Sequence, residues 1–148
     1  MNSSQQKPIL TLVIVFVATA VFAAEHGTKP DAQTLVTRVI HQFEQVGAEQ
    51  TFSEINAGAE DFRIRDISVY VLDRLGVVVA HSGDPNRVGT SPLWRRAFPQ
   101  EMLDDVLVQA GTDGFIENYS EIKDHPTDPG HAYIRAAGDY LFVSDYYE

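Results

Sequence analysis

Hydrophobic residues recur at helical spacing in the segment 32–46. The positions concerned are Leu35, Val36, Val39, Ile40, Phe43 and Val46. Spacings of three and four are typical of an amphipathic helix that packs one face against a core. Gly47 marks the natural end of this helix. Phe52 and Ile55 then indicate a second short helical piece that begins near Thr51.

Two β-hairpins follow from the pattern of β-branched and turn residues. Segments 67–72 and 77–81 are rich in such residues, and the linking residues 73–76 end in a glycine that supplies the positive φ of a short loop. The same pattern near the C-terminus predicts strands at 131–136 and 140–146.

The middle of the chain predicts one further helix and one further strand. Residues 99–110 start with a proline and carry an apolar stripe, and residues 115–122 are typical of a strand. The proline-containing segment 123–130 fits only a loop. The predicted fold class is therefore α+β, with a five-stranded antiparallel sheet on which a long N-terminal helix and a further helix pack.

The N-terminal residues have the pattern of a secretion signal. Lys7 precedes an apolar run of 14 residues at 9–22, and small residues follow at Ala23 and Ala24. The run is shorter than the roughly 18–20 residues that a membrane-spanning helix needs. We predict a signal peptide at 1–23 that is cleaved after Ala23, and a single domain at 24–148; an uncleaved signal anchor is the alternative.

The charge of the mature chain excludes several classes of partner. Without Lys7 the chain keeps 10 of its 11 basic residues against 21 acidic ones, a net charge of −11. Nucleic acid and anionic membrane surfaces are poor partners for such a protein, and stable membrane insertion is not expected after cleavage. Because the chain has no cysteine, disulfides and thiolate metal sites are excluded.

Four sequence features together resemble the single Cache domain of type 2. They are the hairpin segment 68–81, the following segment Asp84-Pro85-Asn86-Arg87-Val88-Gly89, the pair Gly114-Phe115 with Tyr133, and Gly138-Asp139-Tyr140. The resemblance covers residues 34–147. Within the family, the chain resembles the free-standing, secreted members.

This resemblance implies an extracytoplasmic, periplasmic or secreted, sensing domain. Such domains hold a small ligand between a PAS-like sheet and the loops and helix covering the side opposite the long N-terminal helix. Members commonly bind small organic acids, and most act in signal transduction as parts of chemoreceptors or kinases. We therefore expect a small organic acid as ligand, a membrane receptor or kinase as partner, and no cofactor.

The chain departs from the family pattern at several positions. Ser68 stands where relatives usually carry tyrosine, Ser82 where a proline usually follows the histidine, and Asp145 where a small residue is usual. Residues 91–96 replace a stretch that is often rich in aspartate.

Polar residues on the predicted strands and in the following loop are the candidate ligand contacts. The predicted ligand-binding residues are Ser68, Tyr70, His81, Trp94, Arg95, Tyr119, His131 and Tyr133. Tyr70 and His81 can donate hydrogen bonds to a carboxylate, and an arginine fork at Arg95, or at Arg96, matches it geometrically. Each of these residues also has a structural alternative to ligand contact. Tyr70 can simply pack, His81 can bond to the backbone, and the arginines can form surface ion pairs.

Catalytic motifs are absent, so no enzymatic activity is expected. Asp124, His125, Asp128 and His131 have a composition that could hold a divalent metal, but a solvated loop is the better interpretation of this segment, so no metal site is predicted. Two alternatives to ligand sensing follow: an interaction module that docks on a membrane sensor without its own ligand, and a metal-assisted hydrolase that uses the 124–131 loop.

Overall fold

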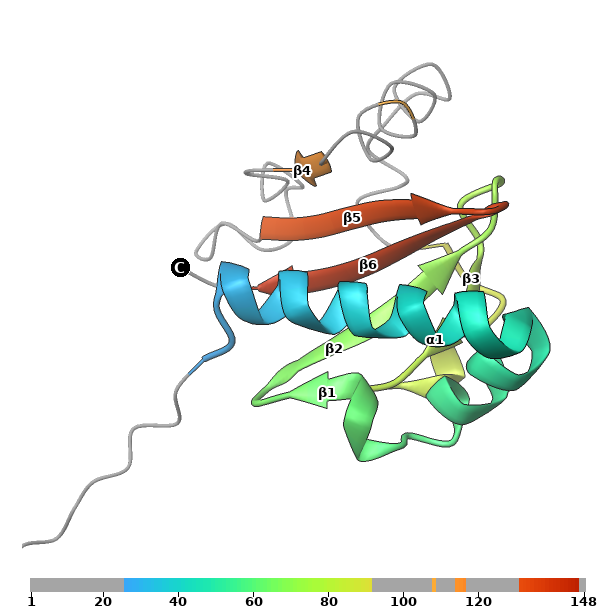
Figure 1. Cartoon of the computed structure of the whole chain (residues 1–148), viewed down its shortest axis with the longest axis horizontal. Coiled ribbons are helices and arrows are strands. Elements are labelled where there is room, and N and C mark those ends of the chain that lie inside the picture. Colours follow the sequence, from blue (N-terminus) through green and yellow to red (C-terminus); the bar gives the residue numbers. More distant parts are fainter. Residues whose placement is uncertain (1–25, 92–107, 109–113, 117–130, 147–148) are drawn as a thin grey trace, which may run out of the picture.

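Helix α1 (Lys29–Asn56) lies along one face of an antiparallel sheet (Figure 1). The computed structural model describes residues 26–91, 108, 114–116 and 131–146. Within these segments, no helix is both long and apolar enough to cross a bilayer. The arrangement is α+β, as the sequence predicts.

The first turns of α1 are fixed by a polar cap and by one buried apolar stripe. Asp31 Oδ2 accepts hydrogen bonds from the backbone N–H and the hydroxyl of Thr28, both at 2.9 Å. A carboxylate at this position also interacts favourably with the positive end of the helix dipole. Fully buried residues of the stripe are Ala32, Leu35, Val36 and Val39, so the spacing read from the sequence does mark the buried face.

Helix α1 bends sharply at Gly47, which has φ 83° and ψ 176°. This conformation is essentially restricted to glycine. The sequence predicts that the helix ends here; in the structure it resumes beyond the bend and takes in the short piece expected from Thr51. The aromatic rings near the bend are those of Phe43, Phe52, Tyr140 and Phe142, whose centroid separations are 4.8–6.3 Å. These ring contacts hold the two arms of α1 against the sheet.

In the described part of the chain, five main strands form the sheet, and all their pairings are antiparallel. They are β2 (Ile67–Leu72), β3 (Val78–His81), β4 (Gly114–Ile116), β5 (His131–Ala137) and β6 (Tyr140–Tyr146). Their spatial order is β3-β2-β6-β5-β4, and the two-residue strand β1 (Arg63–Ile64) pairs with the start of β2. Both predicted hairpins are confirmed. The centre of the sheet is the β2–β6 pair, which joins segments more than 60 residues apart in the sequence.

The turns of the two hairpins are tied to each other at one end of the sheet. In the β2–β3 turn, Asp73 Oδ1 accepts from the backbone N–H groups of Leu75 and Val77 at 2.8 and 3.0 Å. Arg74 in this turn forms an exposed ion pair with Asp139 in the β5–β6 turn. Exposed pairs of this kind contribute little to stability.

The two faces of the sheet carry separate sets of buried side chains. Facing α1 are Val69, Val71, Tyr133, Phe142 and Tyr146, which pack with the stripe of the helix. On the opposite face Leu72, Ile134, Leu141 and Val143 are each no more than 2% exposed. Alternation along the strands therefore produces two apolar surfaces, and the one opposite α1 also holds the candidate site.

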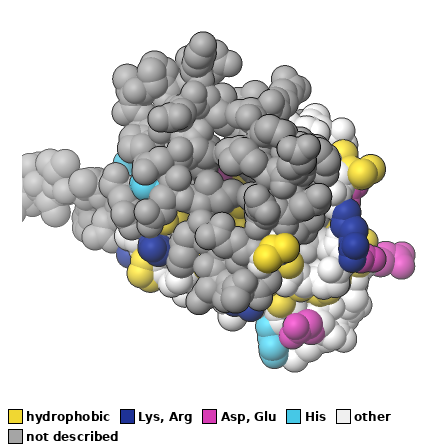
Figure 2. Space-filling view, turned by 90° about the horizontal axis from the view of Figure 1, so that it is seen from above, with side chains coloured by type: hydrophobic (Ala, Val, Ile, Leu, Met, Phe, Trp, Pro, Cys, Tyr) yellow, Lys and Arg dark blue, Asp and Glu magenta, His cyan; other side chains and the backbone are white. Residues whose placement is uncertain are grey.

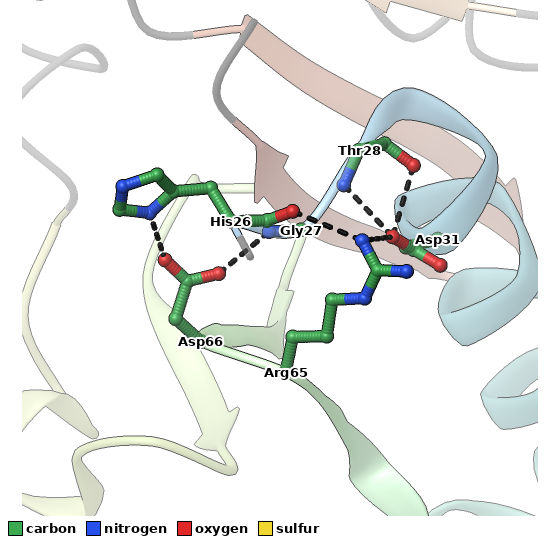
Figure 3. A network of polar contacts seen from close by, with 6 residues as sticks. All are labelled: His26, Gly27, Thr28, Asp31, Arg65 and Asp66. Atoms are coloured by element: carbon green, nitrogen blue, oxygen red, sulfur yellow. Dashed lines mark hydrogen bonds and ion pairs between the residues drawn. The ribbon is translucent and has the colours of Figure 1, made fainter. Parts of the chain in front are cut away.

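The start of α1 is fastened to the β1–β2 turn by a polar network (Figure 3). Asp66 accepts a hydrogen bond from the backbone N–H of Gly27 at 2.7 Å and contacts His26 Nδ1 at 2.6 Å. Arg65 donates to the carbonyl oxygen of His26 at 3.2 Å and pairs with Asp31 at 3.4 Å. The chain that enters α1 is thus held beside the edge of the sheet.

Several predicted elements lie outside the described residues. They are the signal peptide at 1–23, the loop at 123–130, most of the strand predicted at 115–122 and the helix predicted at 99–110, of which only Val108 is described, as helical. These elements stay predictions.

Candidate functional site

Tyr70 and His81 stand side by side on the sheet face opposite α1. They are paired residues of β2 and β3, and their rings stack with centroids 5.4 Å apart and an interplanar angle of 11°. Tyr70 is 5% exposed, whereas His81 is partly exposed. The pleat explains the placement, because residues directly opposite each other in neighbouring strands project to the same side of a sheet.

Asp145 of β6 completes this cluster from the other side of β2. Its Oδ1 accepts a hydrogen bond from the Tyr70 hydroxyl at 3.1 Å. Because the phenol donates its only hydrogen to this carboxylate, the Tyr70 oxygen can act toward other groups only as an acceptor. In the sequence, Asp145 is distinguished only as a departure from the family pattern. The pairing of β6 with β2 determines the face of the sheet on which Asp145 lies.

His81 is held as a neutral ring with a defined tautomer. Its Nδ1 accepts hydrogen bonds from the backbone N–H groups of Gly83 at 3.1 Å and Asp84 at 2.9 Å. The hydrogen of the neutral ring therefore sits on Nε2. Burial lowers the pKa of His81 below its usual 6.5, the Arg87 guanidinium lowers it further, and Asp84 only partly opposes the two. His81 therefore bonds to the backbone through Nδ1, which is one of the alternatives that the sequence leaves open. Its Nε2–H can still act as a hydrogen-bond donor.

Ser68 lies beside this cluster, one alternation from Tyr70 on β2. A Cβ built on Gly83 would come within 2.9 Å of Ser68 Oγ. The loop after β3 therefore passes directly over Ser68, and only a residue without a side chain permits this approach.

Ser82, which stands where relatives usually carry proline, ties the end of β3 to its surroundings. Its N–H donates to the carbonyl oxygen of Val69 at 2.9 Å, and its hydroxyl donates to the carbonyl oxygen of Phe62 at 2.7 Å. The same hydroxyl oxygen accepts from the N–H of Val69 at 3.0 Å. Proline lacks the N–H and the hydroxyl, so none of these bonds is open to it.

His131 and Tyr133 lie on the face that α1 covers. Tyr133 is 3% exposed and belongs to the core under the helix, and its hydroxyl accepts from Arg135 Nη1 at 3.4 Å. His131 stacks on Tyr146 with centroids 5.2 Å apart. The structure thus brings Ser68, Tyr70 and His81 together on one face and places His131 and Tyr133 on the other.

The remaining candidate residues cannot be placed. Trp94, Arg95 and Tyr119 lie outside the described residues, as do Asp124, His125 and Asp128 of the candidate metal loop. Among the residues that are described, no group of three or more histidine or acidic side chains is arranged to hold a metal ion.

These observations define an α+β domain with one long helix on one side of a PAS-like antiparallel sheet and a small polar cluster on the other. Comparison with solved structures finds distant similarities of fold. A methyl-accepting chemotaxis protein from Vibrio parahaemolyticus is 15% identical, with a TM-score of 0.49 over 78% of this chain and 82% of that one.

Two further structures are similar to the same degree. A periplasmic sensor domain of a chemotaxis protein is 16% identical (TM-score 0.48; 80% of this chain, 88% of that one). A Cache chemosensory domain described for carboxylic acid recognition is also 16% identical (TM-score 0.48; 78% and 87%). No family model matches the chain, and a comparison with curated proteins finds no match. All three structural similarities are distant.

Proposed function

We propose that this protein is an extracytoplasmic sensing domain that reversibly binds a small organic molecule on the sheet face opposite α1. The observation that carries the proposal is the cluster of Tyr70, His81 and Asp145 on an otherwise apolar surface. A few polar groups on an apolar background are typical of small-molecule sites, in which the polar groups fix the orientation of the ligand.

A carboxyl group on the ligand fits the donor at His81. The backbone bonds to Nδ1 aim the Nε2–H of the neutral ring away from the loop at 83–84. A hydrogen bond from a neutral donor to a carboxylate is charge-assisted and hence stronger than one between two neutral groups. We therefore propose a small organic acid as ligand, held at its carboxyl group by His81.

Ser68 is proposed to contribute a hydroxyl beside Tyr70, since both project from the same face of β2. Trp94, Arg95 and Tyr119 remain predicted contacts. Tyr133 is buried between the sheet and α1, and His131 stacks on Tyr146 of the same layer. We propose that both residues act on ligand binding only through the packing of that layer.

The predicted signal peptide supports a location in the periplasm or outside the cell. We propose that the domain binds its ligand reversibly, without making or breaking covalent bonds, and then hands over to a membrane receptor or kinase as its partner. A domain of this kind changes its own stability and surface when it is occupied, and a partner can sense that change.

A thermal-shift screen of the purified protein against short carboxylic acids and amino acids tests the proposal. A ligand at 100 times its dissociation constant stabilises a protein by about 2.7 kcal/mol, which for a domain of this size raises the melting temperature on the order of 10 °C. A flat response across the whole panel would contradict ligand binding and favour the docking module.

The surface gives the docking alternative no specific support within the described segments. The large apolar side chains exposed there are Val46, Leu75, Val88 and Val108, which lie on separate elements. Seen from above, the apolar side chains of the described residues form small separated groups, and acidic and basic side chains are neighbours (Figure 2). Docking surfaces usually present a larger contiguous apolar patch.

A further inference from the structure

The segment 83–88 after strand β3 forms an exposed flap. Only Asp84 in this segment is half-buried, and the turn of 3-10 helix inside it, Pro85–Arg87, buries no residue. The flap is fixed at its two ends. The buried Ser82 precedes it, and two backbone hydrogen bonds of 2.8 Å join residues 89–90, which follow it, to strand β3. The flap itself therefore has no buried side chain that fixes its middle to the domain.

Between these ends, the hydrogen bonds that join the flap to the rest of the described domain all end at one atom. That atom is His81 Nδ1, which accepts from the backbone N–H groups of Gly83 at 3.1 Å and Asp84 at 2.9 Å. The remaining bonds of the flap are internal or reach only Thr90 at its end. His81 is thus the single latch of a flap that is ordered within itself.

A proton on His81 Nδ1 would break both of these bonds. A neutral imidazole has one nitrogen that accepts a hydrogen bond, whereas an imidazolium has none. Both nitrogens of the charged ring carry a hydrogen, so the two backbone N–H groups of the flap would lose their acceptor. Protonation therefore removes the latch without any change elsewhere in the sheet.

The charges around His81 act on this equilibrium, and two of them belong to the flap. Burial lowers the pKa of His81 first, Arg87 lowers it further, and Asp84 partly opposes them. The other titratable groups on this side of the ring are Tyr70 of β2, which stacks on it, and Asp145 of β6, which Tyr70 contacts. Release of the flap would hydrate the ring and withdraw Arg87, so the charged ring is better accommodated in the open state.

The flap also borders the site proposed for the ligand. A Cβ built on Gly83 would lie 2.9 Å from Ser68 Oγ, so the flap passes directly over Ser68. A carboxylate bound at His81 Nε2 would place a negative charge beside the ring, and an opposite charge favours the protonated imidazole. An acid ligand and a proton would therefore favour the same state of His81.

We propose that the flap 83–88 is a switch that opens when His81 is protonated, and that a carboxylate at Nε2 promotes this opening. The opened flap changes the surface that a partner meets, so ligand binding becomes readable from outside the site. The ligand step rests on the proposed function, whereas the proton step concerns the protein without ligand.

Nuclear magnetic resonance of the purified, ligand-free protein tests the proton step. The His81 ring and the amides of Gly83 and Asp84 should titrate together, with a midpoint below 6.5. Hydrogen-exchange protection of these two amides, corrected for the intrinsic rate, should fall at least threefold between pH 7.5 and pH 5. The amide of Val143 in the centre of the sheet should stay protected. Flap amides that stay equally protected while the ring titrates would overturn the proposal.

Two variants separate the latch from general effects of acid. In His81→Gln the protection of the flap should no longer depend on pH, because glutamine does not titrate. Arg87→Gln, at an exposed position, should raise the midpoint of the His81 titration, and it provides the test if His81→Gln fails to fold. The control is Arg74→Gln, which makes the same change in net charge in the exposed β2–β3 turn and should leave the midpoint unchanged. An unchanged midpoint in Arg87→Gln would overturn the link between the flap and the ring.

Acetate, propionate, L-lactate and pyruvate, added one at a time, test the ligand step. An acid that binds should raise the midpoint of His81 and lower the protection of the flap amides at pH 7. By linkage it should bind at least threefold more tightly at pH 5.5 than at pH 7.5, and His81→Gln should abolish this dependence. Binding with the midpoint and the flap unchanged would overturn the ligand step and leave the proposed function in place. Absence of binding by all four acids would count against the proposed function and the ligand step together, while the titration of the ligand-free protein decides the proton step.

Discussion

At the scale of single residues, the two tyrosines on opposite faces of the sheet give a direct comparison. Tyr70→Phe removes the hydroxyl that donates to Asp145. We expect ligand affinity to fall about tenfold, or about 1.4 kcal/mol, because Asp145 loses the hydrogen bond that holds its side chain in the cluster. The fold should stay intact by circular dichroism.

Tyr133→Phe is the matched control, because it deletes the same atom from the face under α1. It should leave ligand affinity unchanged in the same titration. Equal effects of the two substitutions would place the site differently from the cluster proposed here.

His81 predicts a dependence of stability on pH. Its folded pKa is lowered by burial, then by Arg87, so the unfolded chain binds the proton more readily than the folded one. The stabilisation is therefore fully present above about pH 6.5, the usual pKa of histidine, and is lost as the pH falls from there toward the lowered folded pKa. Denaturant titrations between pH 8 and pH 5 measure this slope.

The variant His81→Gln should flatten that slope, because glutamine does not titrate. His41→Gln is the control, since His41 is exposed on α1, and the slope should persist in it. A wild-type stability that rises as the pH falls below 6.5 would contradict the neutral state assigned to His81.

At the scale of elements, Ser82 shows how one buried hydroxyl can connect three segments. It bridges β2, the end of β3 and the turn at 60–62. Ser82→Ala leaves the N–H of Val69 and the carbonyl of Phe62 without this partner. We expect a loss of about 1–3 kcal/mol in the free energy of unfolding. Urea denaturation measures it, and the exposed Ser53→Ala should cost less than about 0.5 kcal/mol.

Helix α1 and the two hairpins were largely predictable from the sequence. Periodicity of 3.6 residues identified the buried stripe of α1, and alternation with turn residues identified β2, β3, β5 and β6 nearly to the residue. The continuation of α1 beyond Gly47 was not predicted. A glycine at φ 83° allows a bend as readily as an end, and the ring contacts that decide between them join residues distant in the sequence.

At the scale of the whole molecule, the proposed location makes a prediction about processing. Expression with export in a bacterial host should yield a mature protein that begins at Ala24, because the small residues before this position fit a signal peptidase site. Intact mass spectrometry of the periplasmic fraction measures the N-terminus. Recovery of the chain with residues 1–23 attached, in the membrane fraction, would support the signal anchor instead.

The sequence alone determined what depends on neighbours along the chain: the helix, the hairpins, the acidic balance, and the fact that Tyr70 shares a strand face with Ser68 while Tyr133 shares one with His131. It did not determine which of these strand faces lie on the same side of the sheet. That depends on the register between β2 and β6, where Val69 pairs with Ser144, and between β6 and β5, where Ser144 pairs with Tyr133.

Side chains along a strand alternate between the two faces of the sheet. The pairing of one residue therefore fixes the face on which every other side chain of that strand lies. These two registers place Val69 and Tyr133 under α1, and Tyr70 with Asp145 on the opposite face. Contacts between segments more than 60 residues apart carry no signature in local sequence, so only the tertiary structure could bring Asp145 into the site and separate Tyr133 from it.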